Sequence, residues 1–448
     1  MKSLTKGNPL KLITLFAIPL AIGQLFQQFY SLVDIRIVGS ALGEIPLAAV
    51  GASTVFSDFV IGFINYFCNG FAIVIATCFG SGNDKNLKKA IAASFITGAV
   101  LSLILTISFM IFMDPLLRIL NVDASLMDMS KSYLSIIILG LFFTILYNTC
   151  AAVLRGIGDT VTPLIFLILS SILNILLDYI FIICLHMGVA GASAATVLSQ
   201  AISAVLCVIR IIKKYPVLHL SREDFSYDGA IYSNILTTGF SMALMISLVH
   251  MGTLILQSAI NSFGAYVIVA HTAARKMSHL MMMPCSFYGT ALAAFSGQNY
   301  GAGEHERIRK GCISSIIAVS IWNTAWLILV WIAGRNIISL ISASSNEEVL
   351  YWGSMYLKVD ICFYLLCALI CLIRNTLQGM GHSMITIISS FLELLVKSVI
   401  AFTLAPVMGY WGIIWCEPIA WVIMLIPLLI EWFLVFGKHS LEKNGSQQ

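Results

Sequence analysis

Long apolar runs, interrupted only by short polar loops, restrict this chain to folds that sit in a lipid bilayer. Hydrophobic residues fill 59% of the 448 positions and charged residues only 10%, whereas a typical soluble domain carries about 25% charged residues. Such a chain cannot remove its apolar surface from water by folding alone, so the solvent for most of that surface is lipid. Hydrocarbon offers the backbone no hydrogen bonds, and runs of this length satisfy them as helices. The sequence therefore predicts an all-α integral membrane protein.

A hydrocarbon core of ordinary thickness is crossed by about 20 apolar residues in a helix. On that scale the chain contains twelve predicted transmembrane helices, six before and six after a polar segment. The predicted spans are 12–39, 46–79, 89–113, 130–155, 162–184, 190–213, 232–260, 265–297, 311–334, 350–378, 384–406 and 410–436.

The polar segment also divides the chain into predicted domains. Residues 1–213 are expected to form an N-terminal six-helix bundle with a cation site, residues 214–231 a cytoplasmic linker, and residues 232–448 a C-terminal six-helix bundle. The loops on the side of the N-terminus collect most lysines and arginines, and the loops of the other side hold only Arg118, Lys131 and Arg335. By the positive-inside rule, both termini are expected in the cytoplasm.

The two halves repeat one another in a single register. FGSGNDKNLKKA (79–90) aligns with YGAGEHERIRKG (300–311), LRGIGDT (154–160) with LQGMGHS (377–383), and GVAG (188–191) with GYWG (409–412). The offset stays between 221 and 223 residues. Because each half has six spans, both copies have the same orientation. The sequence thus predicts two pseudo-symmetric bundles in a parallel repeat, related by an axis along the membrane normal.

Two homologous six-helix bundles around a central cleft are the usual architecture of an alternating-access transporter. The chain has no HExxH, GxSxG, nucleotide-binding or selectivity-filter motif, so we expect a transporter and not an enzyme, with no cofactor besides a coupling ion. The net charge of +4 is too small and too scattered to indicate a nucleic-acid partner. Without an ATP-binding motif, uphill transport must draw on an ion gradient. An uncoupled channel is the alternative from another class.

Three helices of the first half carry uninterrupted polar stripes at helical spacing. A carboxylate that faces lipid at mid-membrane costs roughly 2.5–3.5 kcal/mol, so these stripes are expected to face one another. The stripes are Gln24, Gln27, Ser31 and Asp34 in the first span, Ser171, Asn174 and Asp178 in the fifth, and Ser193, Thr196, Gln200 and Ser203 in the sixth.

A cation site is the function that this convergence favours. Asp34, Asn174, Asp178 and Thr196 supply two carboxylates, an amide oxygen and a hydroxyl, which are hard oxygen donors suited to Na⁺. The same two carboxylates also suit H⁺, because both cannot stay ionised close together in a low dielectric. Na⁺ and H⁺ both remain open, and the plainer alternative is that these groups only hold helices together.

The second half lacks this set of residues. At the repeat offset, Asn174 corresponds to Lys397, Asp178 to Ala401 and Thr196 to Glu417, while Asp34 corresponds to Ile255. The predicted cation site therefore belongs to one bundle only.

Further polar and methionine side chains are candidates for a substrate cleft. Flexible thioethers suit promiscuous apolar binding. The predicted cleft residues are Gln24, Gln27, Ser31, Asn65, Met242, Met245, His271, Met282 and Glu393.

Charged residues of the second half leave two questions open. Glu393 and Lys397, four residues apart, form either an internal ion pair or, through Glu393, a counter-charge for a cationic drug. His271, Arg275 and His279 either relay protons, bind an anionic substrate or form a water-exposed cleft wall, which we prefer.

The chain resembles the MATE (multidrug and toxic compound extrusion) transporters along essentially its whole length. The resemblance rests on Pro19 fifteen residues before Asp34, on the N-x-x-x-D of NILLD (174–178), on GVAGASAAT (188–196), and on the RGxGDTxTP pattern at 155–163. The segment GFSMALMISLVHM (239–251) lacks the carboxylate of the NorM-like branch, so the resemblance is to the DinF-like bacterial branch.

This resemblance implies a twelve-helix, V-shaped pair of bundles around a central cleft in the bacterial plasma membrane. It implies a monomeric antiporter that exports organic cations and other amphiphilic drugs in exchange for H⁺ or Na⁺. By position, Asp34, Asn174, Asp178 and Thr196 match the cation-site residues of that branch, and Pro19 matches a proline whose helix bends between states. The alternative is a flippase for a lipid-linked or other large amphiphile in the same superfamily, although flippases commonly have fourteen spans.

Overall fold

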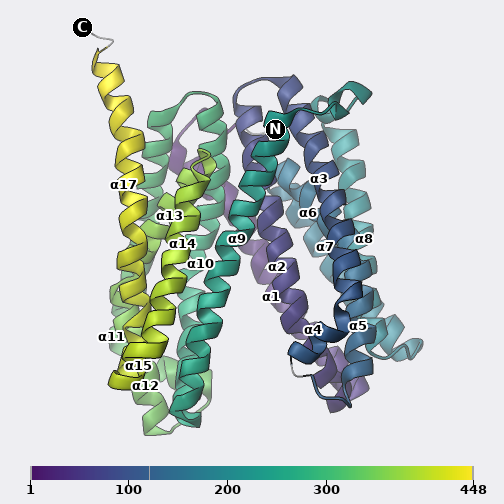
Figure 1. The fold of residues 1–448 in the computed structure, drawn as a ribbon, viewed down its shortest axis with the longest axis vertical. Coiled ribbons are helices and arrows are strands. Elements are labelled where there is room, and N and C mark those ends of the chain that lie inside the picture. The colour runs from purple at the N-terminus through teal and green to yellow at the C-terminus, as the bar shows by residue number, and fades with distance from the viewer. Residues whose placement is uncertain (1–2, 121, 446–448) are drawn as a thin grey trace. The chain divides into compact units, whose positions relative to one another are not determined.

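The computed structural model of the chain describes residues 3–120 and 122–445, with side chains through residue 437. Helices joined by short turns fill this part of the chain, and it contains no strand (Figure 1). Lipid imposes this arrangement, because an α-helix satisfies its own backbone groups without water. The predicted all-α membrane fold is confirmed.

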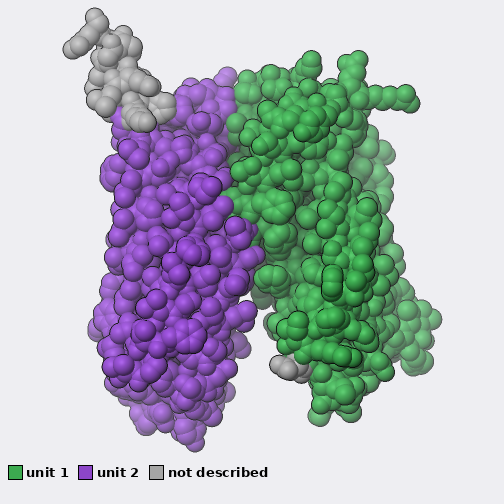
Figure 2. All heavy atoms as spheres, in the orientation of Figure 1, with its two compact units in different colours: residues 1–3, 18–243 green, residues 4–17, 244–448 purple. Residues whose placement is uncertain are grey.

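Two compact units make up the chain (Figure 2). Unit 1 is Met1–Ser3 with Ile18–Ala243, and unit 2 is Leu4–Ala17 with Leu244–Gln448. The helices α1 (Pro9–Leu42) and α9 (Gly229–Ile260) therefore each begin in one unit and end in the other. The division into domains at 1–213, 214–231 and 232–448 stays a prediction.

Unit 1 consists of most of α1, the beginning of α9 and the helices between them. The segment before α9 is fastened within this unit by an ion pair of 3.1 Å between Lys89 Nζ and Asp228 Oδ2. The intervening helices are α2 (Glu44–Gly80), α3 (Asp84–Ile111), α4 (Met113–Ile119), α5 (Met127–Leu139), α6 (Leu141–Gly156), α7 (Val161–Asp178) and α8 (Val189–Lys214), with short turns η2 (Pro216–Leu218) and η3 (Arg222–Phe225).

Unit 2 consists of the first residues of α1, the end of α9 and all later helices. Its N-terminal segment is fastened by the Leu4 amide, which donates to Gln298 Oε1 at 2.8 Å, and by Arg307, which donates to the Gly7 carbonyl at 2.9 Å. The helices are α10 (Ala265–Gly301), α11 (His305–Ser342), α12 (Glu347–Cys362), α13 (Tyr364–Gly379), α14 (Ser383–Val399), α15 (Ala405–Met408), α16 (Tyr410–Ile414) and α17 (Cys416–Gly445), preceded by the turn η4 (Asn261–Phe263).

Each predicted span falls on helix. In the described part of the chain, nine helices are long and apolar enough to cross a membrane, or eleven if the bent pairs α5–α6 and α12–α13 each count as one span. The predicted span 265–297 lies on α10, which is long enough but contains His271, Arg275, Lys276 and His279 and is less apolar than the others.

The repeat predicted from the sequence recurs in the backbone. Four glycines of unit 1 have positive φ angles, and each has a counterpart at the repeat offset with nearly the same angle. An L-residue with a side chain rarely adopts such angles, so the same turns recur at the same places. The pairs are Gly43 (87°) with Gly264 (89°), Gly82 (69°) with Gly303 (74°), Gly158 (86°) with Gly381 (89°), and Gly188 (62°) with Gly409 (61°).

Two helical irregularities recur in the same way. The chain bends by 43° between α5 and α6, at Gly140, and by 53° between α12 and α13, at Phe363. A π-helical segment η1 (Tyr179–Cys184) follows α7 directly, and η5 (Ile400–Leu404) follows α14. Such π-turns are rare and concentrate at functional sites. The first of them begins immediately after Asp178.

Asp159, in the LRGIGDT motif, organises the start of α7. Its Oδ1 accepts hydrogen bonds from the Val161 and Thr162 amides at 3.1 and 3.0 Å, and Oδ2 accepts from the Thr162 and Tyr215 hydroxyls. Partial burial acts to raise the pKa of Asp159, but these hydrogen bonds and nearby Lys214 outweigh it and lower the pKa. The motif is explained by helix capping and loop anchoring.

A close backbone approach within unit 1 joins α2 to α9. A Cβ atom on Gly70 would lie 2.6 Å from the Gly239 Cα atom, which is backbone and cannot turn aside. Small residues at such contacts are a common way for membrane helices to pack closely, since van der Waals contact must replace the hydrophobic effect in lipid.

Gly70→Ala is expected to lower the stability of the purified protein by about 1–3 kcal/mol, because α2 and α9 must separate to admit the methyl group. The measurement is the thermal unfolding midpoint in detergent. Gly62→Ala on the same helix is the matched control, because a Cβ there meets nothing within 4 Å. Equal midpoints for the two variants would contradict the close contact.

Candidate functional site

Three helices of unit 1 position the predicted cation-site residues. Asp34 lies on α1, Asn174 and Asp178 on α7, and Thr196 on α8. Asn174 is 3% exposed and Asp178 is completely buried, while Asp34 and Thr196 are partly buried. Asp178 is the last residue of α7 before the π-helical segment.

The structure brings these four residues together in pairs. Asn174 Nδ2 donates to Thr196 Oγ1 at 3.3 Å, which connects α7 to α8, and the Thr196 hydroxyl donates to the Ala192 carbonyl at 3.1 Å. The carboxyl groups of Asp34 and Asp178 lie close enough to interact electrostatically, which connects α1 to α7. The convergence of the stripes at these positions agrees with the helical spacing of the sequence.

Four oxygen atoms at this place accept no hydrogen bond. They are Asp34 Oδ1, Asn174 Oδ1, Asp178 Oδ1 and Asp178 Oδ2, and each is buried. A buried acceptor without a donor is costly, and a buried carboxylate without a counter-charge is costlier still. A cation supplies both the positive charge and the contacts that these oxygens lack. The donor set is all oxygen, which suits Na⁺, and the paired carboxylates equally suit H⁺.

The described residues include no group of three or more His, Cys, Asp or Glu side chains that could hold a metal ion. The four residues Asp34, Asn174, Asp178 and Thr196 offer two carboxylates with neutral amide and hydroxyl oxygens.

Three further polar residues of the stripes have neutral partners. The Thr144 hydroxyl donates to Gln200 Oε1 at 2.5 Å, and the Ser171 and Ser203 hydroxyls donate to the carbonyls of Leu167 and Phe166. The bonds of Gln200 and Ser203 connect neighbouring helices.

Two tyrosines near the site were not among the predicted residues. Tyr30 lies on α1 one turn before Asp34, and Tyr133 lies on α5. Both tyrosines are close enough to Asp34 to interact with it electrostatically. The i, i+4 spacing of Tyr30 and Asp34 is a sequence signal for the first. Tyr133 comes from a distant helix, so helical spacing gives no signal for it.

The predicted cleft residues have varied surroundings. In unit 1, Gln27 and Ser31 are exposed, Gln24 and Asn65 are partly exposed, and Met242 is buried. In unit 2, Met282 is partly exposed, whereas Met245, His271 and Glu393 are buried. Their assignment to one substrate surface stays a prediction, as does the role of Pro19, which lies inside α1.

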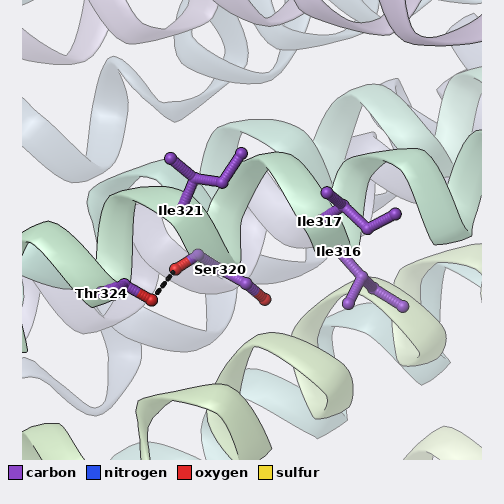
Figure 3. Close-up of a pocket in the computed structure, with 5 residues that line it drawn as sticks. All are labelled: Ile316, Ile317, Ser320, Ile321 and Thr324. Atoms are coloured by element: carbon purple, nitrogen blue, oxygen red, sulfur yellow. Dashed lines mark hydrogen bonds between the residues drawn. The ribbon is translucent and has the colours of Figure 1, made fainter.

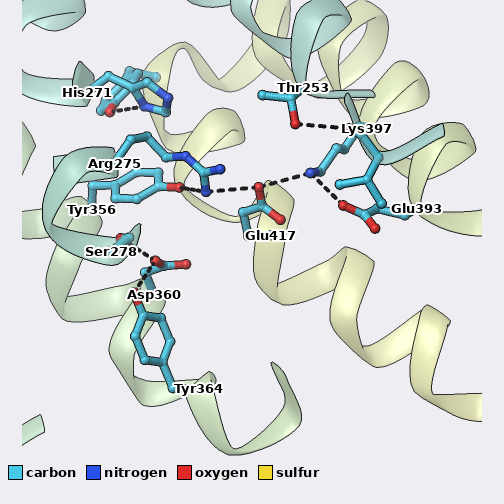
Figure 4. Close-up of polar contacts among 12 residues, drawn as sticks. Thr253, His271, Arg275, Ser278, Tyr356, Asp360, Tyr364, Glu393, Lys397 and Glu417 are labelled. Atoms are coloured by element: carbon cyan, nitrogen blue, oxygen red, sulfur yellow. Dashed lines mark hydrogen bonds and ion pairs between the residues drawn. The ribbon is translucent and has the colours of Figure 1, made fainter. Parts of the chain in front are cut away.

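Unit 2 contains a connected network of buried charges (Figure 4). Lys397 Nζ lies 2.8 Å from Glu393 Oε1 and 3.1 Å from Glu417 Oε1, and Arg275 lies 3.2 Å from the same Glu417 oxygen. Three helices contribute, because Arg275 is on α10, Glu393 and Lys397 are on α14, and Glu417 is on α17. The internal ion pair, one of the two alternatives for Glu393 and Lys397, is present, and both members are buried.

The water-exposed wall that we preferred for the start of α10 does not match the burial of His271. His271 is 4% exposed and its Nδ1 lies 3.0 Å from the Tyr410 hydroxyl, while the Arg275 side chain is 36% exposed. Tyr410 follows His271 by 139 residues, and Glu417, the partner of Arg275, follows it by 142 residues. The sequence pattern of α10 alone could therefore not reveal these partners.

Asp360 on α12 is a further buried carboxylate of unit 2. It is 1% exposed, and its Oδ2 accepts hydrogen bonds from Ser278 at 2.9 Å and Tyr364 at 3.1 Å (Figure 4). Neutral hydroxyl donors hold it, in contrast to the charged partners of Glu417.

A shallow groove on α11 lies apart from both clusters. Its lining is mostly isoleucine with two hydroxyls, and none of the predicted site residues contributes (Figure 3). The Thr324 hydroxyl donates to the Ser320 carbonyl of its own helix at 2.8 Å. A groove of this character on a membrane helix suits lipid tails and offers no ion-binding chemistry. Its lining residues are Ile316, Ile317, Ser320, Ile321 and Thr324.

Comparison with known proteins gives consistent matches over most of the chain. A family model described as MatE matches residues 19–180 and 229–403. The chain is 27% identical over 399 residues to the probable multidrug resistance protein YpnP of Bacillus subtilis (strain 168), with 89% of this chain and 87% of that protein covered. It is 24% identical over 408 residues to the multidrug export protein MepA of Staphylococcus haemolyticus (strain JCSC1435), with coverage of 90% and 89%.

Solved structures with the same fold cover nearly all of the chain. A crystal structure of MATE in the bent conformation has a TM-score of 0.88 and 22% identity, with 98% of each chain covered. The outward-facing conformation of a multidrug resistance MATE family transporter has a TM-score of 0.85 and 24% identity, with 96% of this chain and 98% of that chain covered. At these identities, the likeness demonstrates a shared fold.

Thr196→Val is expected to destabilise the purified protein by about 0.5–1.5 kcal/mol, because it leaves the buried Asn174 Nδ2 without an acceptor. The thermal unfolding midpoint in detergent measures the effect. Thr196→Ser keeps the hydroxyl and is the matched control. A Val variant as stable as the Ser variant would show that the hydrogen bond between α7 and α8 contributes nothing.

Proposed function

Because the chain belongs to the MatE family, whose members are membrane transporters and not enzymes, we propose that it is a multidrug antiporter driven by an ion gradient. It exports organic cations and other amphiphilic drugs and takes up H⁺ or Na⁺ in exchange. The single observation that carries the proposal is the pair Asp34 and Asp178, whose buried oxygens lack donors and a counter-charge. The names of the relatives YpnP and MepA support the substrate class.

The cation binds in unit 1. H⁺ or Na⁺ neutralises the repulsion between Asp34 and Asp178 and contacts the oxygens that otherwise lack partners, with Asn174 and Thr196 as neutral neighbours. The π-helical segment after Asp178 leaves the end of α7 free to adjust, since π-turns interrupt the regular helical hydrogen bonds.

Export follows from reciprocal binding of the cation and the drug. If cation binding lowers the affinity for the drug, then drug binding must lower the affinity for the cation by the same factor. Neutralising Asp34 relaxes the packing of the second part of α1, and we place the bend of that helix at Pro19. One charge that crosses 100 mV releases about 2.3 kcal/mol, which is enough to drive a drug against a concentration gradient.

The remaining parts of the proposal concern setting and substrate. We place the protein in the bacterial plasma membrane, as a monomer with both termini in the cytoplasm. Gln24, Gln27, Ser31, Asn65, Met242, Met245, His271 and Met282 are proposed to contact substrate, with Glu393 as a weaker member because Lys397 already neutralises it.

Asp178→Asn is expected to abolish drug resistance in an efflux-deficient bacterial host while the protein is still made and inserted. The amide cannot take up H⁺ and binds Na⁺ without charge attraction, so the exchange stops. The measurement is the minimum inhibitory concentration of ethidium, with membrane protein quantified in parallel. Asp114→Asn is the control, since it makes the same chemical change at an exposed carboxylate on α4. Wild-type resistance in the Asp178 variant would overturn the site.

Replacing Na⁺ by choline at a fixed proton gradient identifies the coupling ion. Ethidium transport into proteoliposomes is expected to stop in choline if Na⁺ drives it, or to continue until the proton gradient is collapsed if H⁺ drives it. Transport that survives both treatments would contradict antiport and would favour an uncoupled channel.

A further inference from the structure

Equivalent positions connect equivalent helices in the two units, but with different chemistry. In unit 1, Asn174 on α7 donates to Thr196 on α8 at 3.3 Å. At the repeat offset these residues become Lys397 on α14 and Glu417 on α17, which form an ion pair of 3.1 Å. A neutral hydrogen bond in one unit is therefore replaced by an ammonium and a carboxylate in the other.

The ammonium group of Lys397 is buried and contacts two carboxylates. Lys397 is 2% exposed, and its Nζ contacts Glu393 at 2.8 Å as well as Glu417. Gly252 on α9 makes room for the lysine stem, because a Cβ there would lie 3.1 Å from the Lys397 side chain. The second cation, Arg275, lies 3.2 Å from Glu417. Lys397 and Arg275 thus pair with Glu393 and Glu417, while the nearby Asp360 has only neutral hydroxyl donors (Figure 4).

Unit 1 has the opposite balance. No ion pair among the described residues involves Asp34 or Asp178. Their carboxylates lie close together, and three of their four oxygens are buried without a hydrogen-bond partner. The carboxylates of unit 1 are therefore available to an external cation, whereas Glu393 and Glu417 of unit 2 are paired with cationic side chains of the chain itself.

We propose that Lys397 is a tethered counter-cation, whose ammonium group permanently fills in unit 2 the role that an external H⁺ or Na⁺ fills in unit 1. The inference rests on the cation exchange proposed above for Asp34 and Asp178. Lys397 then determines how many cations the protein binds. Because its ammonium group occupies the place of a cation in unit 2, the protein takes up external cations in unit 1 only. Removing the tethered charge converts Glu393 and Glu417 into a second site that takes an external cation.

Of the titratable groups around Lys397, only Glu393, on its own helix α14, differs between the proteins compared below. The groups that stay the same are Glu417 on α17, Arg275 and His271 on α10, Tyr356 and Asp360 on α12, and Tyr410 on α16. Asp360 keeps its donors Ser278 and Tyr364 in every variant.

The test uses the purified full-length protein in detergent, with Asp178→Asn present throughout to remove the contribution of unit 1. Three proteins are compared, namely Asp178→Asn alone, the same with Lys397→Met, and the same with Lys397→Met and Glu393→Gln. The last is the matched control, because it removes one positive and one negative charge and leaves the Arg275–Glu417 pair intact. The thermal midpoint is recorded against pH in choline buffer and against Na⁺ concentration at fixed pH.

Only the protein with Lys397→Met and an intact Glu393 is expected to gain a dependence on cations. A site for one proton should raise its midpoint by roughly 1–2 °C for each unit of pH decrease between its raised pKa in the folded protein and its lower pKa in the unfolded chain, or Na⁺ should raise the midpoint with a slope of about one ion. The other two proteins should lack this added dependence. The same dependence in all three would overturn the role of Lys397.

The reciprocal variant keeps the inference testable if Lys397→Met does not fold. Asn174→Lys in the otherwise wild-type protein places an ammonium at the equivalent position of unit 1, and is expected to remove the cation dependence of the midpoint. Retention of the wild-type dependence would contradict the inference. Absence of any difference between wild type and Asp178→Asn would instead contradict the proposed exchange site, independently of Lys397.

Discussion

A carboxylate buried in hydrocarbon must find a positive partner or a proton, and this requirement determines where the polar residues of the chain lie. Water is absent, so the cost of an unpaired charge is several kcal/mol and cannot be spread over solvent. In unit 2, Lys397 and Arg275 meet the requirement for Glu393 and Glu417. Unit 1 leaves Asp34 and Asp178 without a cation of the chain. The two units therefore differ in how their buried carboxylates are paired.

Units 1 and 2 share the same backbone features around these different charges. The same lack of water makes every span a helix, and the turns between helices recur at matching glycines such as Gly188 and Gly409, with φ of 62° and 61°. The bends at Gly140 and Phe363 and the π-helical segments after α7 and α14 recur as well. One backbone therefore carries two different sets of charges, and function follows from the side chains and not from the fold.

The length of the apolar runs was sufficient to predict the helices, and helical spacing predicted one cluster of side chains. The predicted spans 46–79 and 190–213 lie inside Glu44–Gly80 and Val189–Lys214. The contact between Asn174 and Thr196 followed from stripes that alternate with the helical period, since each stripe is uninterrupted and has only one face to present. The repeated loop motifs of the sequence contain positive-φ glycines such as Gly82 and Gly303, because a turn of this kind favours glycine in both copies.

The network of unit 2 was only partly predictable. Glu393 and Lys397 lie one turn apart on one helix, so their pairing is a local property of α14. Arg275 meets Glu417 across 142 residues, and helical spacing reports only which residues share a face of the same helix. Pairing between helices requires their rotation and depth, which depend on packing against close contacts such as Gly252 with Lys397.

An asymmetric pair of repeats separates two demands that one site cannot meet at once. A coupling site must remain incompletely satisfied, because carboxylates with permanent partners have no reason to bind and release an ion. A stable membrane bundle must satisfy its buried charges at all times, because an unpaired charge destabilises every state of the cycle. In unit 2, Glu393 and Glu417 have the permanent partners Lys397 and Arg275, whereas Asp34 and Asp178 in unit 1 have buried oxygens without a partner. In the exchange that we propose, the carboxylates that bind and release the cation are therefore those of unit 1 alone.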